Sequence, residues 1–201
     1  MLEMQHIDVS FRSEKTNFLF KDARQQVLYD VNFKIKEGTC LGILGESGSG
    51  KSTTGRVLCG LLKPDRGNVL LKGKDVYASR AGRRYLQENI SIVFQDYTTS
   101  VNPRFRIKDI IGEGLKVYER HIGKTLDMKA EIEDLLIKVG LEASLIERYP
   151  HELSGGQLQR VCIARAIASR PKLIVLDEAI SSLDAHTQVQ IMDLLRKRGL
   201  T

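Results

Sequence analysis

The sequence lacks any apolar run long enough to span a membrane. Its longest stretches, such as Leu173–Leu176, fall far below the ~18 residues that a membrane helix needs. Residues 1–6 also lack the basic and apolar regions of a signal peptide. These absences predict a protein that remains in the cytoplasm, whereas the absence of tryptophan excludes no class of protein.

Cysteine and proline are scarce, with three and four residues among 201. Cys40, Cys59 and Cys162 lack metal-ligand spacing, and we interpret them as small buried apolar side chains in a reducing compartment. The few prolines and the 42% of hydrophobic residues exclude long disordered arms. The length suits one sizeable α/β core and is short for two independent domains.

The net charge of +6 favours anionic partners, namely nucleotides, nucleic acid or an acidic membrane surface. A solvated basic surface explains the same charge equally well, so charge alone does not decide between these partners.

The apolar pattern predicts a mixed arrangement of strands and helices. Residues 3–11 and 27–35 alternate between polar and apolar, which predicts antiparallel strands with one covered face. The apolar run 39–44 predicts a buried parallel strand, followed by a helix over 51–62. Further strands are expected at 68–71, 90–94 and 172–176, and further helices at 128–139, 157–169 and 188–198.

Residues 45–52, GESGSGKS, fit the phosphate-binding pattern G-x-x-x-x-G-K-[ST] between a predicted strand and a predicted helix. The glycines let successive backbone N–H groups turn toward one anion, and the helix N-terminus adds partial positive charge. Lys51 would reach the β- and γ-phosphates, and Ser52 would offer its hydroxyl to Mg²⁺. A chance glycine-rich turn is the alternative. The residues expected to bind the nucleotide are Gly45, Glu46, Ser47, Gly48, Ser49, Gly50, Lys51, Ser52 and Thr53.

Two carboxylates follow the apolar run 173–176, at the strand edge where ligands bind in open α/β sheets. Asp177 is expected to hold Mg²⁺ through its water shell, and Glu178 to polarise the attacking water as general base. A strand that ends in Asp-Glu can also be a simple loop start. Its place downstream of the phosphate-binding loop favours the catalytic interpretation.

Residues 153–157, LSGGQ, resemble the signature that separates ABC ATPases from other P-loop enzymes. Ser154 and Gln157 also have the spacing of a helix capping box, and the two interpretations are compatible. In this family the serine hydroxyl and the glycine amides face the γ-phosphate of ATP on the other subunit. The resemblance therefore implies that Ser154, Gly155, Gly156 and Gln157 contact nucleotide across a dimer.

Other family elements follow in order. Gln95 resembles the Q-loop glutamine, with catalytic and metal-binding roles, and Asp184 resembles the nucleotide-contacting D-loop aspartate in SSLD, residues 181–184. Phe11 stands where the family places an aromatic ring against adenine. Three other aromatic residues near it remain alternatives, namely Phe18, Phe20 and Tyr29.

The resemblance covers residues 2–200 and implies an α/β P-loop NTPase of ABC type. The expected fold has a mixed, RecA-like parallel sheet, antiparallel N-terminal strands and a helical subdomain. The expected single domain, 1–201, comprises a catalytic core of residues 1–95 and 160–201 and a helical subdomain over about 96–159.

Within the family, residues 95–104 and 154–162 are similar to importers of oligopeptides, dipeptides and nickel, and 154–162 and 177–179 to the nickel branch in particular. The resemblance implies Mg²⁺·ATP, an identical or paralogous second ABC subunit and transmembrane permease subunits at the inner face of the cell membrane. An extracytoplasmic substrate-binding protein would act indirectly, and no nucleic acid is expected. A soluble ABC protein acting on nucleic acid is the alternative. The 57 residues between Gln95 and Leu153 are too few for the long coiled coil typical of that class.

The family carries a switch histidine after the strand that follows the D-loop helix, and the sequence ends at 199–201, about where that strand should begin. In the family this strand lies between the strands expected at 39–44 and 172–176. We therefore expect a C-terminally truncated domain that binds ATP and hydrolyses it poorly, which is a third interpretation of the chain.

Overall fold

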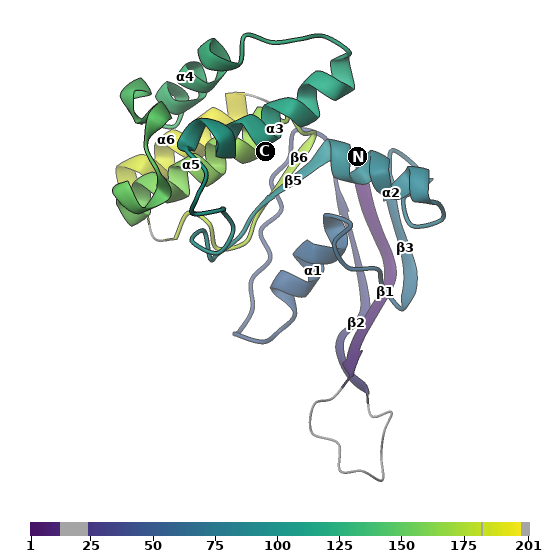
Figure 1. Cartoon of the computed structure of the whole chain (residues 1–201). Helices are drawn as coiled ribbons and strands as arrows, with labels where there is room; N and C mark the ends of the chain where they lie inside the picture. Colours follow the sequence, from purple (N-terminus) through teal and green to yellow (C-terminus); the bar gives the residue numbers. More distant parts are fainter. Residues whose placement is uncertain (13–23, 182, 198–201) are drawn as a thin grey trace. The chain divides into compact units, whose positions relative to one another are not determined.

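A computed structural model describes residues 1–12, 24–181 and 183–197 of the chain (Figure 1). The chain divides into two compact units, residues 1–87 and residues 88–201. The division into a core and a helical subdomain over 96–159 remains a prediction.

The first unit contains an antiparallel sheet with the strand order β2-β1-β3-β4. Its strands are β1 (Leu2–Arg12), β2 (Arg24–Ile35), β3 (Arg66–Leu71) and β4 (Lys74–Asp75). Alternate residues of β1, including Leu2, Met4, Ile7 and Val9, are almost completely buried. The predicted antiparallel strands at 3–11 and 27–35 are therefore confirmed, because their alternation places one face against the core. The strand predicted at 68–71 is also present, as part of β3.

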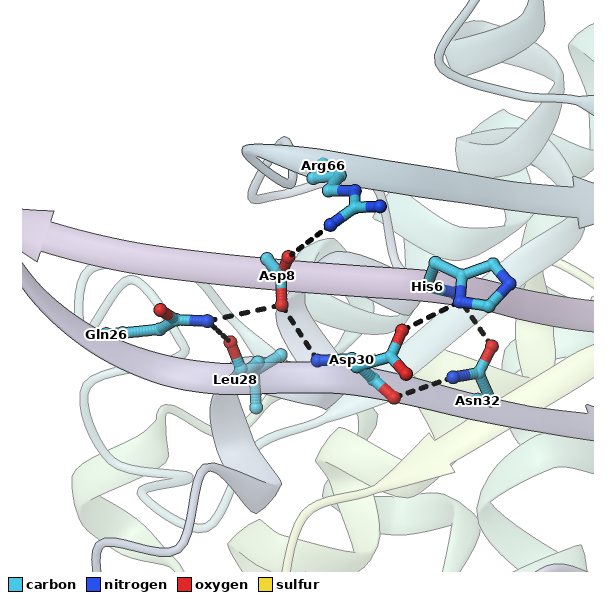
Figure 2. Close-up of polar contacts among 7 residues, drawn as sticks. All are labelled: His6, Asp8, Gln26, Leu28, Asp30, Asn32 and Arg66. Atoms are coloured by element: carbon cyan, nitrogen blue, oxygen red, sulfur yellow. Dashed lines mark hydrogen bonds and ion pairs between the residues drawn. The ribbon is translucent and has the colours of Figure 1, made fainter.

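A bulge interrupts the pairing of β1 with β2, where the register shifts between Met4 and Ile7. His6 and Asp30, on opposite strands, both have positive φ, 54° and 45°. Their backbone N–H groups donate to side chains, His6 to Asn32 Oδ1 at 2.8 Å and Asp30 to Asp8 Oδ1 at 2.7 Å (Figure 2). These side-chain acceptors satisfy donors that the bulge removes from the strand ladder.

Residues 39–44 do not form the predicted strand. They belong to no helix or strand, and their apolar side chains are exposed: Leu41 by 44%, Ile43 by 44% and Leu44 by 97%. An apolar run becomes a strand only where a neighbouring backbone supplies ladder hydrogen bonds, and none of the strands in the described residues pairs with this segment. Cys40 is exposed for the same reason, which corrects its predicted burial, whereas Cys59 and Cys162 are buried as expected.

The helices that begin in the first unit are α1 (Lys51–Leu58) and α2 (Arg80–Asn89), and the last two residues of α2 belong to the second unit. Helix α1 ends before residue 62 because Gly60 adopts φ 72° and the Leu61 N–H donates to Arg56 O at 2.9 Å. This is a Schellman end, which closes the helix. Helix α2 was not predicted, because it is polar and basic and only Leu86 among its apolar side chains is fully buried.

The described residues of the second unit form a parallel strand pair and four α-helices. The strands are β5 (Ile90–Val93) and β6 (Leu173–Leu176), and the helices are α3 (Ile107–Ile122), α4 (Met128–Lys138), α5 (Gly155–Ala168) and α6 (Ala185–Lys197), with short 3-10 turns η1 (Ala143–Glu147) and η2 (Pro150–Glu152). The predicted strands and helices of this part are confirmed, with ends shifted by a few residues. None of the helices in the described ranges is long and apolar enough to cross a membrane.

Helices α3 and α5 pack side by side at Gly114 (Figure 1). A Cβ atom at this position would lie 2.3 Å from the Arg165 backbone oxygen and 2.8 Å from Ala168 Cβ. Close approach of the two helices therefore depends on glycine, since neither neighbour is a flexible side-chain end.

We expect Gly114→Ala to lower the free energy of unfolding by about 3 kcal/mol, the upper end for overpacking a core. Gly112→Ala is the matched control on the same helix, because its Cβ would meet only Met128 Cε at 3.6 Å. The control should gain about 1 kcal/mol from the better helix propensity of alanine. Denaturant unfolding measures both values, and equal effects of the two substitutions would contradict the tight contact.

Candidate functional site

The predicted phosphate-binding loop, residues 45–52, lies in the first unit. Gly48 and Gly50 adopt φ of 83° and 94°, in the left-handed region that only glycine enters without strain. Gly50 is buried against β2, and a Cβ there would lie 2.6 Å from Leu28 Cδ2. The loop ends at Gly50, which is the N-cap of α1, and no side chain caps the first turn of this helix. Its backbone N–H groups are suited to an anion.

Lys51 folds back over the loop. Its ammonium donates to Gly45 O and Glu46 O, each at 2.8 Å, and the turn is closed by the Ser49 N–H, which donates to Glu46 O at 3.2 Å. Residues 45–49 are exposed, while Ser52 and Thr53 in the first helical turn are half-buried. The cation thus lies at the mouth of the loop that the sequence predicts to bind phosphates.

Gln95 and Glu178 meet in the second unit. Strands β5 and β6 are parallel with Val93 paired to Leu176, so Gln95 and Glu178 each follow their strand by two residues at the same carboxyl edge. The Gln95 Nε2 donates to Glu178 Oε2 at 2.8 Å. This contact joins two residues that the sequence assigned to catalysis separately.

The backbone at Glu178 is strained, with φ 52° on a residue that is not glycine. Its carbonyl accepts from Ser181 Oγ at 2.8 Å and from the Ser181 N–H at 3.2 Å, and the next carbonyl, of the fully buried Ala179, accepts from Gln159 Nε2. Asp177 is half-buried, and its backbone N–H donates a hydrogen bond to Val93 O at 3.0 Å. The surrounding hydrogen bonds hold the two carboxylates at the end of β6.

The signature residues form the N-terminus of α5. Ser154 is the N-cap, where its Oγ accepts from the Gln157 N–H at 3.3 Å and its N–H donates to Gln157 Oε1 at 2.9 Å. The predicted capping box is confirmed. Ser154 and Gly155 remain exposed, and Gly156 and Gln157 are half-buried.

Tyr97 is a neighbour of the signature that sequence analysis did not identify. A Cβ added to Gly155 would lie 2.5 Å from the Tyr97 hydroxyl oxygen, so this ring lies directly on the signature glycine. Arg165 Nη1 donates to Ser100 O at 2.8 Å, which ties the same segment to α5. An aromatic residue two positions after Gln95 was the available signal, but its contact depends on tertiary packing.

Asp184 caps α6. Its Oδ1 accepts from the Thr187 N–H at 3.0 Å and its Oδ2 from Thr187 Oγ1 at 2.7 Å. The hydrogen bond from the Thr187 backbone is the main cause that holds the pKa of Asp184 below its ordinary value. Its nucleotide contact remains a prediction, and Ser182 of the same motif lies outside the described residues.

Phe11 lies near the end of β1, paired with Gln25 of β2, and is 40% exposed. Tyr29 is more exposed, at 68%, and Phe18 and Phe20 lie outside the described residues. The exposed ring at the strand end leaves Phe11 available for stacking, so its role at adenine remains a prediction.

The described residues contain no cluster of three or more His, Cys, Asp or Glu side chains that could hold a metal ion. The predicted roles of Ser52, Gln95 and Asp177 at Mg²⁺ remain predictions.

Comparison with known proteins agrees with these motifs. The family model described as ABC transporter matches residues 28–181. The chain is 41% identical to the oligopeptide transport ATP-binding protein OppF of Haemophilus influenzae, over 98% of this chain and 60% of that protein. It is 47% identical to the nickel import ATP-binding protein NikE of Rhodospirillum rubrum, over 85% of this chain and 61% of that protein. The chain spans about three fifths of the length of these relatives.

Among solved structures, a dimeric post-hydrolysis state of the ATP-binding cassette MJ0796 bound to ADP and Pi is similar, with a TM-score of 0.84 and 28% identity. The match covers 99% of this chain and 83% of that chain. The shared fold and the family match over residues 28–181 show that the chain belongs to the ABC transporter family.

Proposed function

We propose that the chain is the ATP-binding motor subunit of an importer for nickel or for oligo- and dipeptides. The observation that carries the proposal is the Gln95–Glu178 hydrogen bond at the carboxyl edge of β5 and β6. Two related proteins named as oligopeptide and nickel importer subunits support the choice of cargo class. Hydrolysis would drive uptake through permease subunits at the inner face of the cell membrane, with an extracytoplasmic substrate-binding protein delivering cargo.

The phosphate-binding loop would hold ATP. Lys51 would exchange its two carbonyl partners, Gly45 O and Glu46 O, for β- and γ-phosphate oxygens, which form stronger charge-assisted hydrogen bonds. The first-turn N–H groups of α1 would bind the same phosphates. Phe11 would stack on adenine.

Glu178 would accept the proton of the attacking water. The Gln95 Nε2 donates to one oxygen of the Glu178 carboxylate at 2.8 Å and so orients the base. The amide oxygen of Gln95 would bind the metal. Ser52, Gln95 and Asp177 would hold Mg²⁺, which when bound neutralises charge on the phosphate oxygens.

Ser154 would act on ATP bound to a second ABC subunit, identical or paralogous, with Gly155, Gly156, Gln157 and Asp184 at the same interface. The exposed N-terminus of α5 suits a γ-phosphate, because its Ser154 and Gly155 lie open on the surface. The dimeric cassette bound to ADP and Pi supports this proposal.

Ser154→Ala should impair ATP-driven association of two ABC subunits more than it impairs ATP binding. Asp127→Ala is the matched control, because Asp127 Oδ1 caps α4 by accepting from the Ala130 N–H at 3.2 Å. Each substitution removes an N-cap and should lower the free energy of unfolding by about 1 kcal/mol. Thermal unfolding and sizing with ATP separate the roles: equal association of the two variants would reduce Ser154 to a helix cap.

The alternative is a soluble ABC ATPase that acts on nucleic acid. In that case the net charge of +6 would attract the phosphate backbone. Phosphate release measured with permease subunits in vesicles, and separately with DNA or RNA, distinguishes the two. We expect stimulation by the permease and none by nucleic acid. Stimulation by nucleic acid alone would reverse the assignment.

A further inference from the structure

The second unit contains a cavity of about 310 Å³ between α3, the start of α4 and η1. It is separate from the signature residues and from Gln95 and Glu178, none of which lines it. Its volume lies at the lower end for ligand pockets, which suits a small molecule.

Apolar side chains line part of this α3–α4 cavity. Ile132 and Ile146 are 3% and 9% exposed, and Met128, whose flexible thioether adapts to irregular shapes, is half-buried. These three residues come from α4 and η1, so they form one wall opposite α3.

Gly112 keeps the cavity open on the side of α3. A Cβ there would meet only Met128 Cε at 3.6 Å, an ordinary contact, and its φ lies outside the left-handed region. Neither packing nor backbone conformation therefore requires glycine, although glycine weakens a helix interior. Gly114 on the same helix contrasts with it, because that residue is needed for contact with α5.

The charged residues at the cavity leave a surplus of positive charge. Glu147 is neutralised by Lys108, whose Nζ donates to both its oxygens at 2.8 Å, and by Arg106 Nη1 at 2.6 Å. These hydrogen bonds hold the pKa of Glu147 below its ordinary value, and the hydrogen bond from Lys108 has the largest effect. Asp109 accepts the Arg106 backbone N–H at 3.1 Å. Both carboxylates, of Asp109 and Glu147, therefore already accept hydrogen bonds from groups of the protein.

The remaining cations at the cavity are Lys116 and Lys129. Lys129 lies 3.8 Å from Glu133, which is too distant for a direct hydrogen bond. Within the described residues the Lys116 ammonium has no hydrogen bond or ion pair. The cavity thus combines an apolar wall with a cation that lacks an internal partner.

We propose that this cavity binds a small amphiphile with a carboxylate on an apolar tail. The carboxylate would pair with Lys116 and Lys129, and the tail would lie between Gly112 and the wall formed by Met128, Ile132 and Ile146. An acyl chain and a peptide with an apolar C-terminal residue share this chemistry.

Decanoate and N-acetylleucine are probes for these two sources, titrated by calorimetry into the full chain. We expect one of them to bind with a 1:1 stoichiometry, and the tighter one identifies the acyl or the peptide source. Gly112→Leu should fill the cavity and weaken binding at least about tenfold. Lys116→Ala should weaken it about threefold, because that lysine is solvent-exposed and the ion pair is screened.

Lys124→Ala is the matched charge control, since Lys124 is exposed and does not line the cavity, and it should leave affinity unchanged. If Gly112→Leu does not fold, Gly112→Ala replaces it, with affinity lowered about threefold and thermal stability raised by the better helix propensity of alanine. Unaltered affinity in the Gly112 variant that folds, or no binding of either probe, would overturn the proposal. ATP binding serves as an independent readout, because it should be the same in every folded variant even if the transport proposal is wrong.

Discussion

Glu178→Gln should leave ATP binding unchanged and lower ATP turnover at least about a hundredfold, the low end for loss of a general base. In the parent, Gln95 Nε2 donates to the Glu178 carboxylate at 2.8 Å, and the amide oxygen of the variant can accept the same hydrogen bond. The substitution therefore preserves the local shape at the end of β6 and removes only the capacity to take a proton. The variant should accumulate as an ATP-bound dimer.

Phosphate release and nucleotide binding, measured on the chain assembled with the proposed permease subunits, test this expectation. Glu142→Gln is the matched control, because Glu142 is an exposed carboxylate whose Oε2 accepts only from Ser144 Oγ among the described contacts. The control should turn over at the parental rate. If Glu178→Gln matched it, another group would be the base.

Lys51→Ala should weaken ATP binding at least about tenfold. Charge-assisted hydrogen bonds contribute on the order of 1.5 to 3 kcal/mol each, so loss of contacts to two phosphates gives an effect of this size or larger. The ammonium now bonds to two exposed loop carbonyls, Gly45 O and Glu46 O, which water can satisfy in the variant. The fold should therefore be preserved.

Calorimetric titration with Mg²⁺·ATP measures the affinity, and Lys63→Ala removes the same charge from an exposed position of the same unit. The Lys63 variant should bind ATP as the parent does. Equal affinities in both variants would remove the phosphate-binding assignment of residues 45–52.

The sequence predicted those parts of the site that depend on local chemistry. The capping box at Ser154 was found as expected, and the loop glycines and the Asp177–Glu178 pair stand before α1 and after β6 as the local pattern predicts. Their roles at the nucleotide remain predictions. The alternating strands of the first unit were also predictable, since their period of two places one face in the core.

Features that depend on distant partners were not predictable. The apolar run 39–44 has the composition of a buried strand, yet a strand needs hydrogen bonds from a neighbouring backbone, and the run is exposed. The contact of Tyr97 with Gly155 and the approach of α3 to α5 at Gly114 likewise arise only when helices pack.

The central claim is that ATP hydrolysis by this chain drives import of a cargo. Its most direct test is a vesicle assay that measures phosphate release together with accumulation of labelled nickel and of labelled oligopeptide, for the parent and for Glu178→Gln. The account predicts that one cargo accumulates in proportion to the phosphate released and that Glu178→Gln abolishes both. Phosphate release at the parental rate without accumulation of either cargo, or accumulation that persists in Glu178→Gln, would contradict it.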